Sequence, residues 1–246
     1  HNWFTISAQS PDVEKQLTQD KDKNRELSLN KDRTLGVYIS GRDEVRVIDL
    51  KTLASTTVVE DELWGLYTPK AHFSPDDRYI VFSPVRNFER EVMLYHRATK
   101  KTLNLTKTLV TETNPVWSPD GRTLAFARFD ASSRCQIMLV AASGGNERKI
   151  ADCFAGMAST YDWTPDGSGL LMGLEAKLAN ERSSPLRKLD IASGNWISLV
   201  YVIADGAIDI DPRYSPDGKW IVFRRSISLS DLWKMPAEGG APQRLT

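Results

Sequence analysis

The sequence has no excess of either charge and no long apolar segment. Lysine and arginine together number 32, and so do aspartate and glutamate, which gives a net charge of +0 over 246 residues. Proteins that hold nucleic acid or a membrane surface by charge need a basic excess, so we expect neither as a partner. No apolar run approaches the roughly 18 residues of a membrane span, so we expect no membrane insertion.

Residues that carry catalysis and metal binding are also scarce, with three histidines and two cysteines. The chain contains no phosphate-binding Gly-x-x-x-x-Gly-Lys loop, no His-Glu-x-x-His motif, no Gly-x-Ser-x-Gly elbow and no paired Cys-x-x-Cys. A Ser-His-Asp triad would need His72 or His96 beside a serine on a sharp turn, and most serines lie in repeated turns. We therefore expect no catalytic residue, no metal and no cofactor in this chain.

What the sequence does have is a turn motif that returns at a regular interval. A worn first copy is Leu27-Ser28-Leu29-Asn30, and the hydroxyl residues of the five copies stand at 28, 74, 118, 164 and 215. The four clear copies are Phe73-Ser74-Pro75-Asp76-Asp77, Trp117-Ser118-Pro119-Asp120-Gly121, Trp163-Thr164-Pro165-Asp166-Gly167 and Tyr214-Ser215-Pro216-Asp217-Gly218. A period of about 44 to 51 residues indicates an array of supersecondary units.

Each residue of the motif has a role in a tight turn. The hydroxyl group can cap nearby backbone, proline presets φ of the next position, and aspartate suits the third. Glycine accepts the left-handed conformation with which a short hairpin rejoins its partner strand. The motif therefore predicts a hairpin between two antiparallel strands.

Three short apolar runs follow the turn in each unit, so each unit reads as four strands. The first runs are Leu35–Ile39, Tyr79–Phe82, Thr123–Phe126, Leu170–Met172 and Trp220–Phe223. The second runs are Val45–Leu50, Val92–Tyr95, Ile137–Val140, Leu186–Leu189 and Leu232–Met235. The third runs are Thr57–Val59, Leu103–Thr106, Lys149–Ala151, Trp196–Val200 and Arg244–Thr246.

These units resemble the WD40-like PD40 repeats of TolB-type β-propellers over essentially the whole chain. The resemblance implies an all-β fold, a β-propeller of four-stranded blades with five complete repeats and a partial blade, six-bladed in the parent protein. We expect a single propeller domain over residues 1–246. Its parts would be a partial blade at 1–18 and repeats at 19–59, 60–106, 107–151, 152–200 and 201–246.

The ends of the chain carry an expectation of their own. Residues 1–18 match the third and fourth strands of a unit, and His1 is not a translation start, so we expect a mature form, an excised part of a longer protein or a composite. Residues beyond 246 would then supply the two inner strands of the sixth blade. Unpaired strand edges favour association, so self-association through open blade edges is expected.

Two narrower resemblances divide the chain. Asn24–Ser28, Gly41–Arg46, Ser83–Glu89 and Thr111–Trp117 resemble the propeller region of tricorn-like serine peptidases. Leu189–Gly194 and Ile208–Arg225 resemble propeller sensor regions of winged-helix transcriptional regulators. The function that the TolB-like resemblance implies is a non-enzymatic scaffold that docks a protein or peptide on one disc face or at the channel mouth. The alternatives are a substrate-gating propeller of a larger peptidase and a regulator's sensor.

Candidate binding residues come from the strand that precedes each turn. Two residues before each hydroxyl residue stand Glu26, His72, Val116, Asp162 and Arg213, and four of these five are polar where an innermost strand would bury apolar residues. Arg25, Asn114 and Asp211 stand just before them. We expect these polar residues at the mouth of a central channel, where they would bind a ligand. The alternative is a channel lined by whatever tolerates water.

The two cysteines, Cys135 and Cys153, bracket one predicted hairpin. Its turn at Ser143–Asn146 places partner positions at an index sum near 289, so the two cysteines fall almost opposite each other, close enough for a disulfide after a small adjustment. Two free buried thiols are the alternative. A disulfide needs an oxidising compartment, and the TolB-like resemblance implies a periplasmic or other extracytoplasmic location in a bacterium, with the cytoplasm as the alternative.

Overall fold

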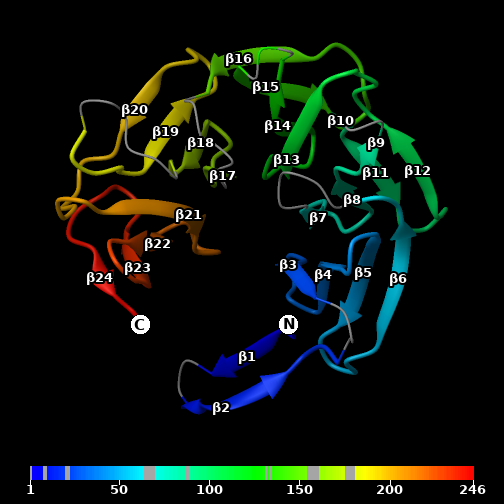
Figure 1. Cartoon of the computed structure of the whole chain (residues 1–246), viewed down its shortest axis with the longest axis horizontal. Coiled ribbons are helices and arrows are strands. Elements are labelled where there is room, and N and C mark those ends of the chain that lie inside the picture. The colour runs from blue at the N-terminus through cyan, green and yellow to red at the C-terminus, as the bar shows by residue number, and fades with distance from the viewer. Residues whose placement is uncertain are drawn as a thin grey trace. The chain divides into compact units, whose positions relative to one another are not determined.

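The computed structural model describes residues 2–7, 10–19, 23–63, 70–86, 89–130, 132, 134–153, 161–174 and 181–246. Within these residues every regular element is a strand (Figure 1). The described part of the chain accordingly holds no helix that is long and apolar enough to cross a membrane. The predicted all-β class is confirmed.

Each of the five predicted repeats forms one four-stranded antiparallel sheet, or blade, whose strands follow chain order. The first blade contains β3 (Asn24–Leu29), β4 (Leu35–Ser40), β5 (Glu44–Asp49) and β6 (Ser55–Glu60). The second contains β7 (Ala71–Phe73), β8 (Tyr79–Phe82), β11 (Met93–His96) and β12 (Lys101–Asn104). The third contains β13 (Thr111–Trp117), β14 (Thr123–Phe129), β15 (Cys135–Ala141) and β16 (Arg148–Asp152). The fourth contains β17 (Tyr161–Trp163), β18 (Gly169–Met172), β19 (Arg187–Asp190) and β20 (Trp196–Ser198). The fifth contains β21 (Ile208–Tyr214), β22 (Trp220–Ser226), β23 (Ser230–Pro236) and β24 (Gln243–Arg244).

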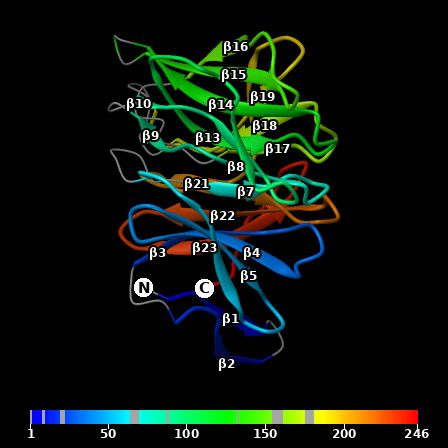
Figure 2. The ribbon, with the colours of Figure 1, turned by 90° about the vertical axis from the view of Figure 1, so that its right-hand side faces the viewer.

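Two further hairpins complete the sheet inventory of the described residues. β1 (Phe4–Ser7) and β2 (Ser10–Gln16) pair only with each other, and Figure 2 shows them as a separate sheet near the N-terminus. β9 (Val85–Arg86) pairs with β10 (Glu89–Arg90) between the second and third strands of the second blade. The β1–β2 sheet is the partial blade that the sequence predicts, so the chain has the predicted β-propeller fold of five complete blades and a partial one.

The chain divides into two compact units. The first comprises His1–Trp117, Gly121–Arg128 and Val140–Glu147, and the second comprises Ser118–Asp120, Phe129–Leu139 and Arg148–Thr246. The strands of the third blade are therefore shared between both units.

The apolar cores follow the two-residue period of the strands. On β4, Val37 and Ile39 are fully buried and pack into one cluster with Phe73 and Phe82 of the second blade. Tyr38, between them in sequence, is equally buried but packs into another cluster with Leu17, which follows β2. Successive side chains of a strand point to opposite faces, so one strand joins two cores and both faces of the first blade are covered.

The turns adopt the geometry that their residues predict. The hydroxyl groups of Ser74, Ser118, Thr164 and Ser215 each donate to the aspartate two residues later, over 2.7, 2.6, 2.6 and 2.6 Å. The hydrogen bonds from the Thr164 hydroxyl and from Ser168 lower the pKa of Asp166 to about 2. Left-handed backbone follows, with φ of 60° at Asp77 and 69°, 71° and 70° at Gly121, Gly167 and Gly218. Glycine has no Cβ to oppose this conformation.

The first turn corrects one prediction from the sequence. Its hydrogen-bonding residue is Asn30 and not Ser28, because the backbone amide of Asn30 donates to the carbonyl oxygen of Leu35, five residues later, at 3.0 Å. The backbone amides of Ser74, Thr164 and Ser215 likewise donate to the carbonyl oxygen five residues later. The Oδ1 of Asn30 accepts hydrogen bonds from the backbone amides of Thr34 and Leu35 at 2.9 Å each. In this turn a carboxamide oxygen therefore takes the place of the hydroxyl oxygen as the acceptor. Measured from Asn30, the steps between turns are 44, 44, 46 and 51 residues.

Candidate functional site

The predicted site residues lie on the first strand of each blade, here called the inner strand, or directly before it. Because the first turn residue is Asn30, two sets of equivalent positions result. The positions two before the turn residue are Ser28, His72, Val116, Asp162 and Arg213. The positions four before it are Glu26, Lys70, Asn114 and Asp211, with the fourth-blade position outside the described residues. Glu26 therefore belongs to the second set, with Asn114 and Asp211, and not to the first.

Three members of the second set share an unusual backbone conformation. Glu26, Asn114 and Asp211 have φ of 51°, 53° and 55°, in the left-handed region that few residues other than glycine adopt. The pairing register shifts between Arg25 and Ser28 and again between Ile210 and Arg213, so β3 and β21 carry a β-bulge there. Bulges re-aim side chains and are common beside functional sites. The repeat thus places a polar residue in left-handed backbone in three different blades, and in two of them at a bulge.

In the first compact unit, equivalent residues of neighbouring blades meet. The ammonium group of Lys70 lies 3.8 Å from Oε2 of Glu26, and the Lys70 side chain is only 6% exposed against 37% for Glu26. Two residues further along the chain in each blade, Nδ1 of His72 and the hydroxyl oxygen of Ser28 are 3.0 Å apart. Asn114 is buried on β13. The Glu26 carboxylate is the accessible charge of this group.

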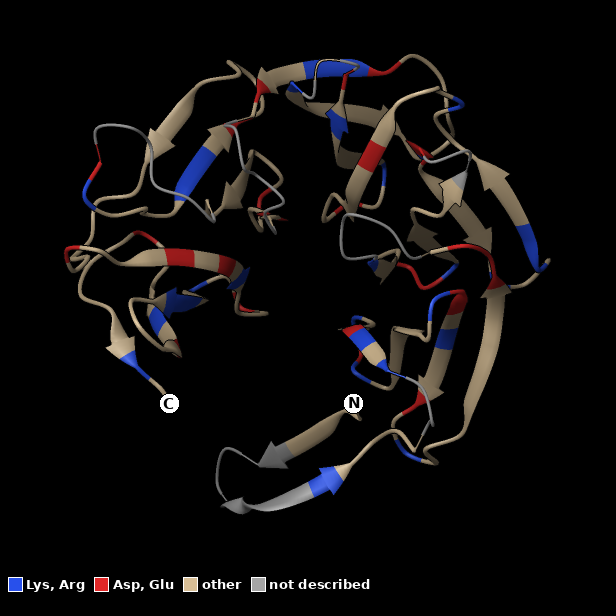
Figure 3. Cartoon of the chain, viewed as in Figure 1, with Lys and Arg blue, Asp and Glu red and all other residues tan. Residues whose placement is uncertain are grey.

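The second compact unit repeats the mixture of charges. Asp162 on β17 is half-buried, and burial raises its pKa although the nearby positive charge of Arg213 acts against the shift. Asp211 pairs with Arg224 of β22 at 2.9 Å, with side chains 39% and 42% exposed. Figure 3 shows acidic segments on β21. On β3 it shows an acidic and a basic segment next to each other. Glu26 and Asp211 are thus equivalent, accessible carboxylates, one in each unit.

Arg25 differs from the other predicted residues. Its guanidinium donates to the carbonyl oxygen of Gly41 at 3.1 Å. Burial and the neighbouring charge of Arg42 both lower its pKa. Arg25 therefore lies beside the turn between β4 and β5, next to another arginine, and helps to hold that turn.

Sequence reasoning missed two residues of the group, Lys70 and Ser28. Lys70 precedes β7 and stands four residues before Ser74, so counting back from each turn finds it. Ser28 was assigned to the turn itself. Ser28, and the equivalence of Lys70 with Glu26, could be found in the same way only once Asn30 is recognised as the turn residue of the first blade.

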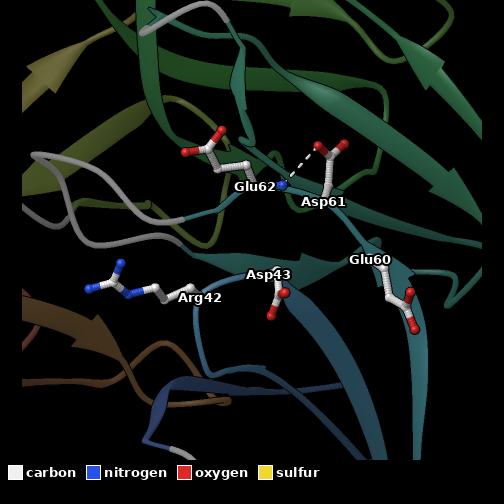
Figure 4. A pocket seen from close by; sticks show the side chains of 5 residues that line it. All are labelled: Arg42, Asp43, Glu60, Asp61 and Glu62. Carbon is white, nitrogen blue, oxygen red and sulfur yellow. Dashed lines mark hydrogen bonds between the residues drawn. The ribbon is translucent and has the colours of Figure 1, made fainter.

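An open pocket lies elsewhere on the first blade. It has a volume of about 410 Å³ and is lined by Arg42, Asp43, Glu60, Asp61 and Glu62. Figure 4 shows their side chains pointing in different directions rather than toward a common point. Among the residues that the structure describes, no three histidine, cysteine or acidic side chains are grouped to hold a metal ion. This pocket offers scattered carboxylates and no assembled site.

Neither described histidine has the geometry of a catalytic base. In a serine triad, Nε2 faces the serine and Nδ1 the carboxylate, whereas in this chain the Nδ1 of His72 faces Ser28. His96 caps the turn after β11, where its Nδ1 accepts the amide of Thr99 at 3.1 Å, and its ring packs edge-on against Tyr79.

Two arginines near the ends of second strands, Arg128 and Arg224, form pairs within their own blades. Arg128 contacts Glu112 and Glu147 of the third blade, and Arg224 contacts Asp211 of the fifth. They are committed to these carboxylates and offer no shared anion site.

Cys135 and Cys153 are joined by a disulfide, with Cα atoms 4.9 Å apart. The neighbouring pair Gln136 and Asp152 are partners in the β15–β16 ladder, and the Cys153 amide donates to the Cys135 carbonyl at 2.9 Å. The bond thus closes the open end of this hairpin, where the two cysteines stand opposite each other.

Comparison with known proteins finds relatives in sequence, although no protein-family model matches. The chain is 27% identical over 177 residues to the uncharacterized peptidase YuxL of Bacillus subtilis, covering 59% of this chain and 26% of that protein. It is 23% identical over 228 residues to the uncharacterized protein Atu1656 of Agrobacterium fabrum, covering 90% of this chain and 72% of that protein. A stretch of 61 residues is 34% identical to the Tol-Pal system protein TolB of Alcanivorax borkumensis, covering 25% of this chain and 14% of that protein. The chain therefore spans only about a quarter of YuxL.

Solved structures share the fold at low identity. TolB from Acinetobacter baumannii superposes with a TM-score of 0.74 at 17% identity, covering 96% of this chain and 57% of that one. An oligogalacturonate lyase from Vibrio parahaemolyticus superposes with a TM-score of 0.70 at 17% identity, covering 99% of this chain and 70% of that one. The tricorn protease superposes with a TM-score of 0.64 at 12% identity, covering 92% of this chain and 26% of that one. The chain therefore has the TolB-like β-propeller fold that its repeats predict, a fold that is also found within enzymes.

Proposed function

We propose that the chain is a non-enzymatic binding module that docks a protein or peptide through the polar residues of its inner strands. The observation that carries the proposal is the left-handed backbone that recurs at Glu26, Asn114 and Asp211. Strained backbone of this kind costs about 1–3 kcal/mol per residue and persists where the surroundings require it. Three blades keep it at one position, which favours a role for the side chains that it presents.

The chemistry of these residues favours a peptide. Glu26 and Asp211 are exposed by 37% and 39%, so their carboxylates can accept hydrogen bonds from backbone amides or basic side chains. Arg224 lies beside Asp211 with its side chain 42% exposed, so its guanidinium is a donor for carbonyl groups. A peptide main chain offers both kinds of partner, which matches this pairing of acceptors with donors.

The affinity of a selected peptide tests the proposal. A peptide chosen from a displayed random library should bind Glu26→Gln or Asp211→Asn at least about ten-fold more weakly than wild type, because a hydrogen bond to a charged group contributes about 1.5–3 kcal/mol. Both substitutions remove charge and keep size. Glu60→Gln, at an exposed position on β6, is the control and should bind like wild type. Equal affinity for all four proteins would rule the inner strands out.

The chain by itself should not hydrolyse peptides or esters. The expectation rests on the orientation of the Ser28–His72 pair, which presents Nδ1 rather than Nε2 to the hydroxyl group. Incubation with a casein digest and with activated esters should give no turnover above buffer. Turnover that disappears in His72→Ala or His96→Ala would assign the chain an active site instead.

A second candidate is the substrate-gating propeller of a larger peptidase. The observation that favours it is the similarity to YuxL, described as a peptidase, over 59% of this chain. In that case Glu26→Gln in the whole protein would raise KM for peptides and leave kcat unchanged, since a gate binds substrate but does not touch the reacting bond.

We also propose an extracytoplasmic, periplasmic location, because structural disulfides such as that between Cys135 and Cys153 form and persist mainly in oxidising compartments. Self-association through open blade edges stays a prediction, and light scattering at high protein concentration checks it.

A further inference from the structure

Three ionisable side chains share one buried cluster in the third blade. Nε of Arg128 donates to Oε1 of Glu112 at 2.9 Å, and its Nη2 donates to the same oxygen at 2.5 Å. The guanidinium also contacts the carboxylate of Glu147. Two carboxyl groups therefore share one positive charge, and the cluster would carry a net charge of −1 if both were ionised.

The two carboxyl groups have different surroundings. Glu112 has no exposed surface, whereas the Glu147 side chain is 16% exposed. Both contacts from Arg128 fall on Oε1 of Glu112, and its Oε2 is buried without a hydrogen-bond partner. The hydroxyl groups of Thr106 and Thr108 lie close enough to act on the carboxyl group of Glu112.

A proton on Oε2 of Glu112 would remove the surplus negative charge of this cluster. It would leave Arg128 and Glu147 as a neutral pair and turn Oε2 into a donor for a nearby hydroxyl oxygen. An ionised Glu112 would instead keep a second negative charge, without any exposed surface, beside a single guanidinium, which is costly in a protein interior. We propose that Glu112 is protonated in the native protein and that the third blade becomes less stable as this proton is released at higher pH.

The other charged groups nearby do not supply the missing compensation. Glu89, on β10, accepts from the hydroxyl group of Thr111 and adds negative charge. The guanidinium of Arg90 donates to the carbonyl oxygens of Ser83 and Leu63, at 2.7 and 2.8 Å. Lys107 is exposed to solvent.

The direction of the pH dependence follows from these surroundings. Burial raises the pKa of Glu112 above its ordinary value of 4.5, and hydrogen bonding from Thr106 and the charge of Arg128 only partly oppose it. A raised pKa means that the folded protein holds the proton more tightly than the unfolded chain. The stabilisation is therefore complete below the ordinary glutamate pKa and is lost as the pH rises through the folded-state pKa.

Unfolding midpoints of Glu112→Gln and Glu147→Gln test the proposal across a pH series. Glutamine mimics the protonated side chain, so Glu112→Gln should equal or exceed the wild-type midpoint at neutral pH, by a margin that grows with pH. Glu147→Gln removes the ionised partner of Arg128 and should lower the midpoint. The reverse order, with Glu112→Gln the less stable variant, would show that Glu112 carries the charge.

Infrared spectroscopy of the wild-type protein gives an answer that does not depend on how the variants fold. The carbonyl stretch of a protonated carboxylic acid should be present at neutral pH and should disappear as the pH rises. The band should be missing in Glu112→Gln. A wild-type spectrum without it at neutral pH would overturn the proposal.

Discussion

Replacing Arg225 with alanine should lower the free energy of unfolding by about 3–5 kcal/mol, the usual cost of removing one partner of a buried ion pair. Arg225 and Asp209 are 5% and 0% exposed. The guanidinium makes a two-pronged contact, with Nε 2.7 Å from Oδ1 and Nη2 2.8 Å from Oδ2. The substitution would leave the Asp209 carboxylate buried and facing only the Tyr201 hydroxyl group, which donates to it at 2.7 Å.

Packing adds to this loss, because the Arg225 guanidinium lies 4.7 Å from the ring centroid of Trp233 and 5.4 Å from that of Phe223. Arg224 is the matched control, the same residue type one position earlier on β22. Its pair with Asp211 is about 40% exposed on both sides, so Arg224→Ala should cost only about 0–1 kcal/mol. Urea unfolding of both variants decides the matter, and similar losses for the two would contradict the assignment of Arg225 to the core.

Breaking the disulfide should cost up to about 3 kcal/mol, the entropic value for a cross-link that closes a loop of this size. The two cysteines are 18 residues apart and close the β15–β16 hairpin where the β-ladder ends. Reduction of the wild-type protein should therefore lower its unfolding midpoint to that of Cys135→Ser/Cys153→Ser. The double variant itself should not respond to the reductant.

Thiol titration of the unfolded, unreduced chain supplies the control. We expect no free thiol. Two free thiols would remove the cross-link, and with it the main physical support for an extracytoplasmic location.

The repeated turns made the fold predictable from the sequence. Serine or threonine, proline, aspartate and glycine each act locally in a turn, so Ser118 to Gly121 identify a hairpin without reference to the rest of the molecule. The alternation of Val37, Tyr38 and Ile39 was equally local, since successive residues of a strand must face opposite sides. Both features depend on near neighbours in the chain, which a single sequence displays.

The candidate site was predicted only in part, because its geometry depends on events that a sequence does not display. Asn30 replaces a hydroxyl residue by a carboxamide that accepts the same backbone hydrogen bonds, and this substitution hid the true register of the first blade. The bulges at Glu26 and Asp211 insert a residue into β3 and β21, and no local residue pattern announced them. The pairing of Lys70 with Glu26 joins two blades, so it appears only once the blades are packed.

Hydrogen exchange with and without a selected peptide tests the central claim, that the inner strands form the binding surface. Peptide binding should slow exchange of backbone amides in β3, in the first unit, or in β21, in the second, and leave the outer strands β6 and β24 unchanged. Protection confined to the outer strands, with none at Glu26 or Asp211, would contradict it.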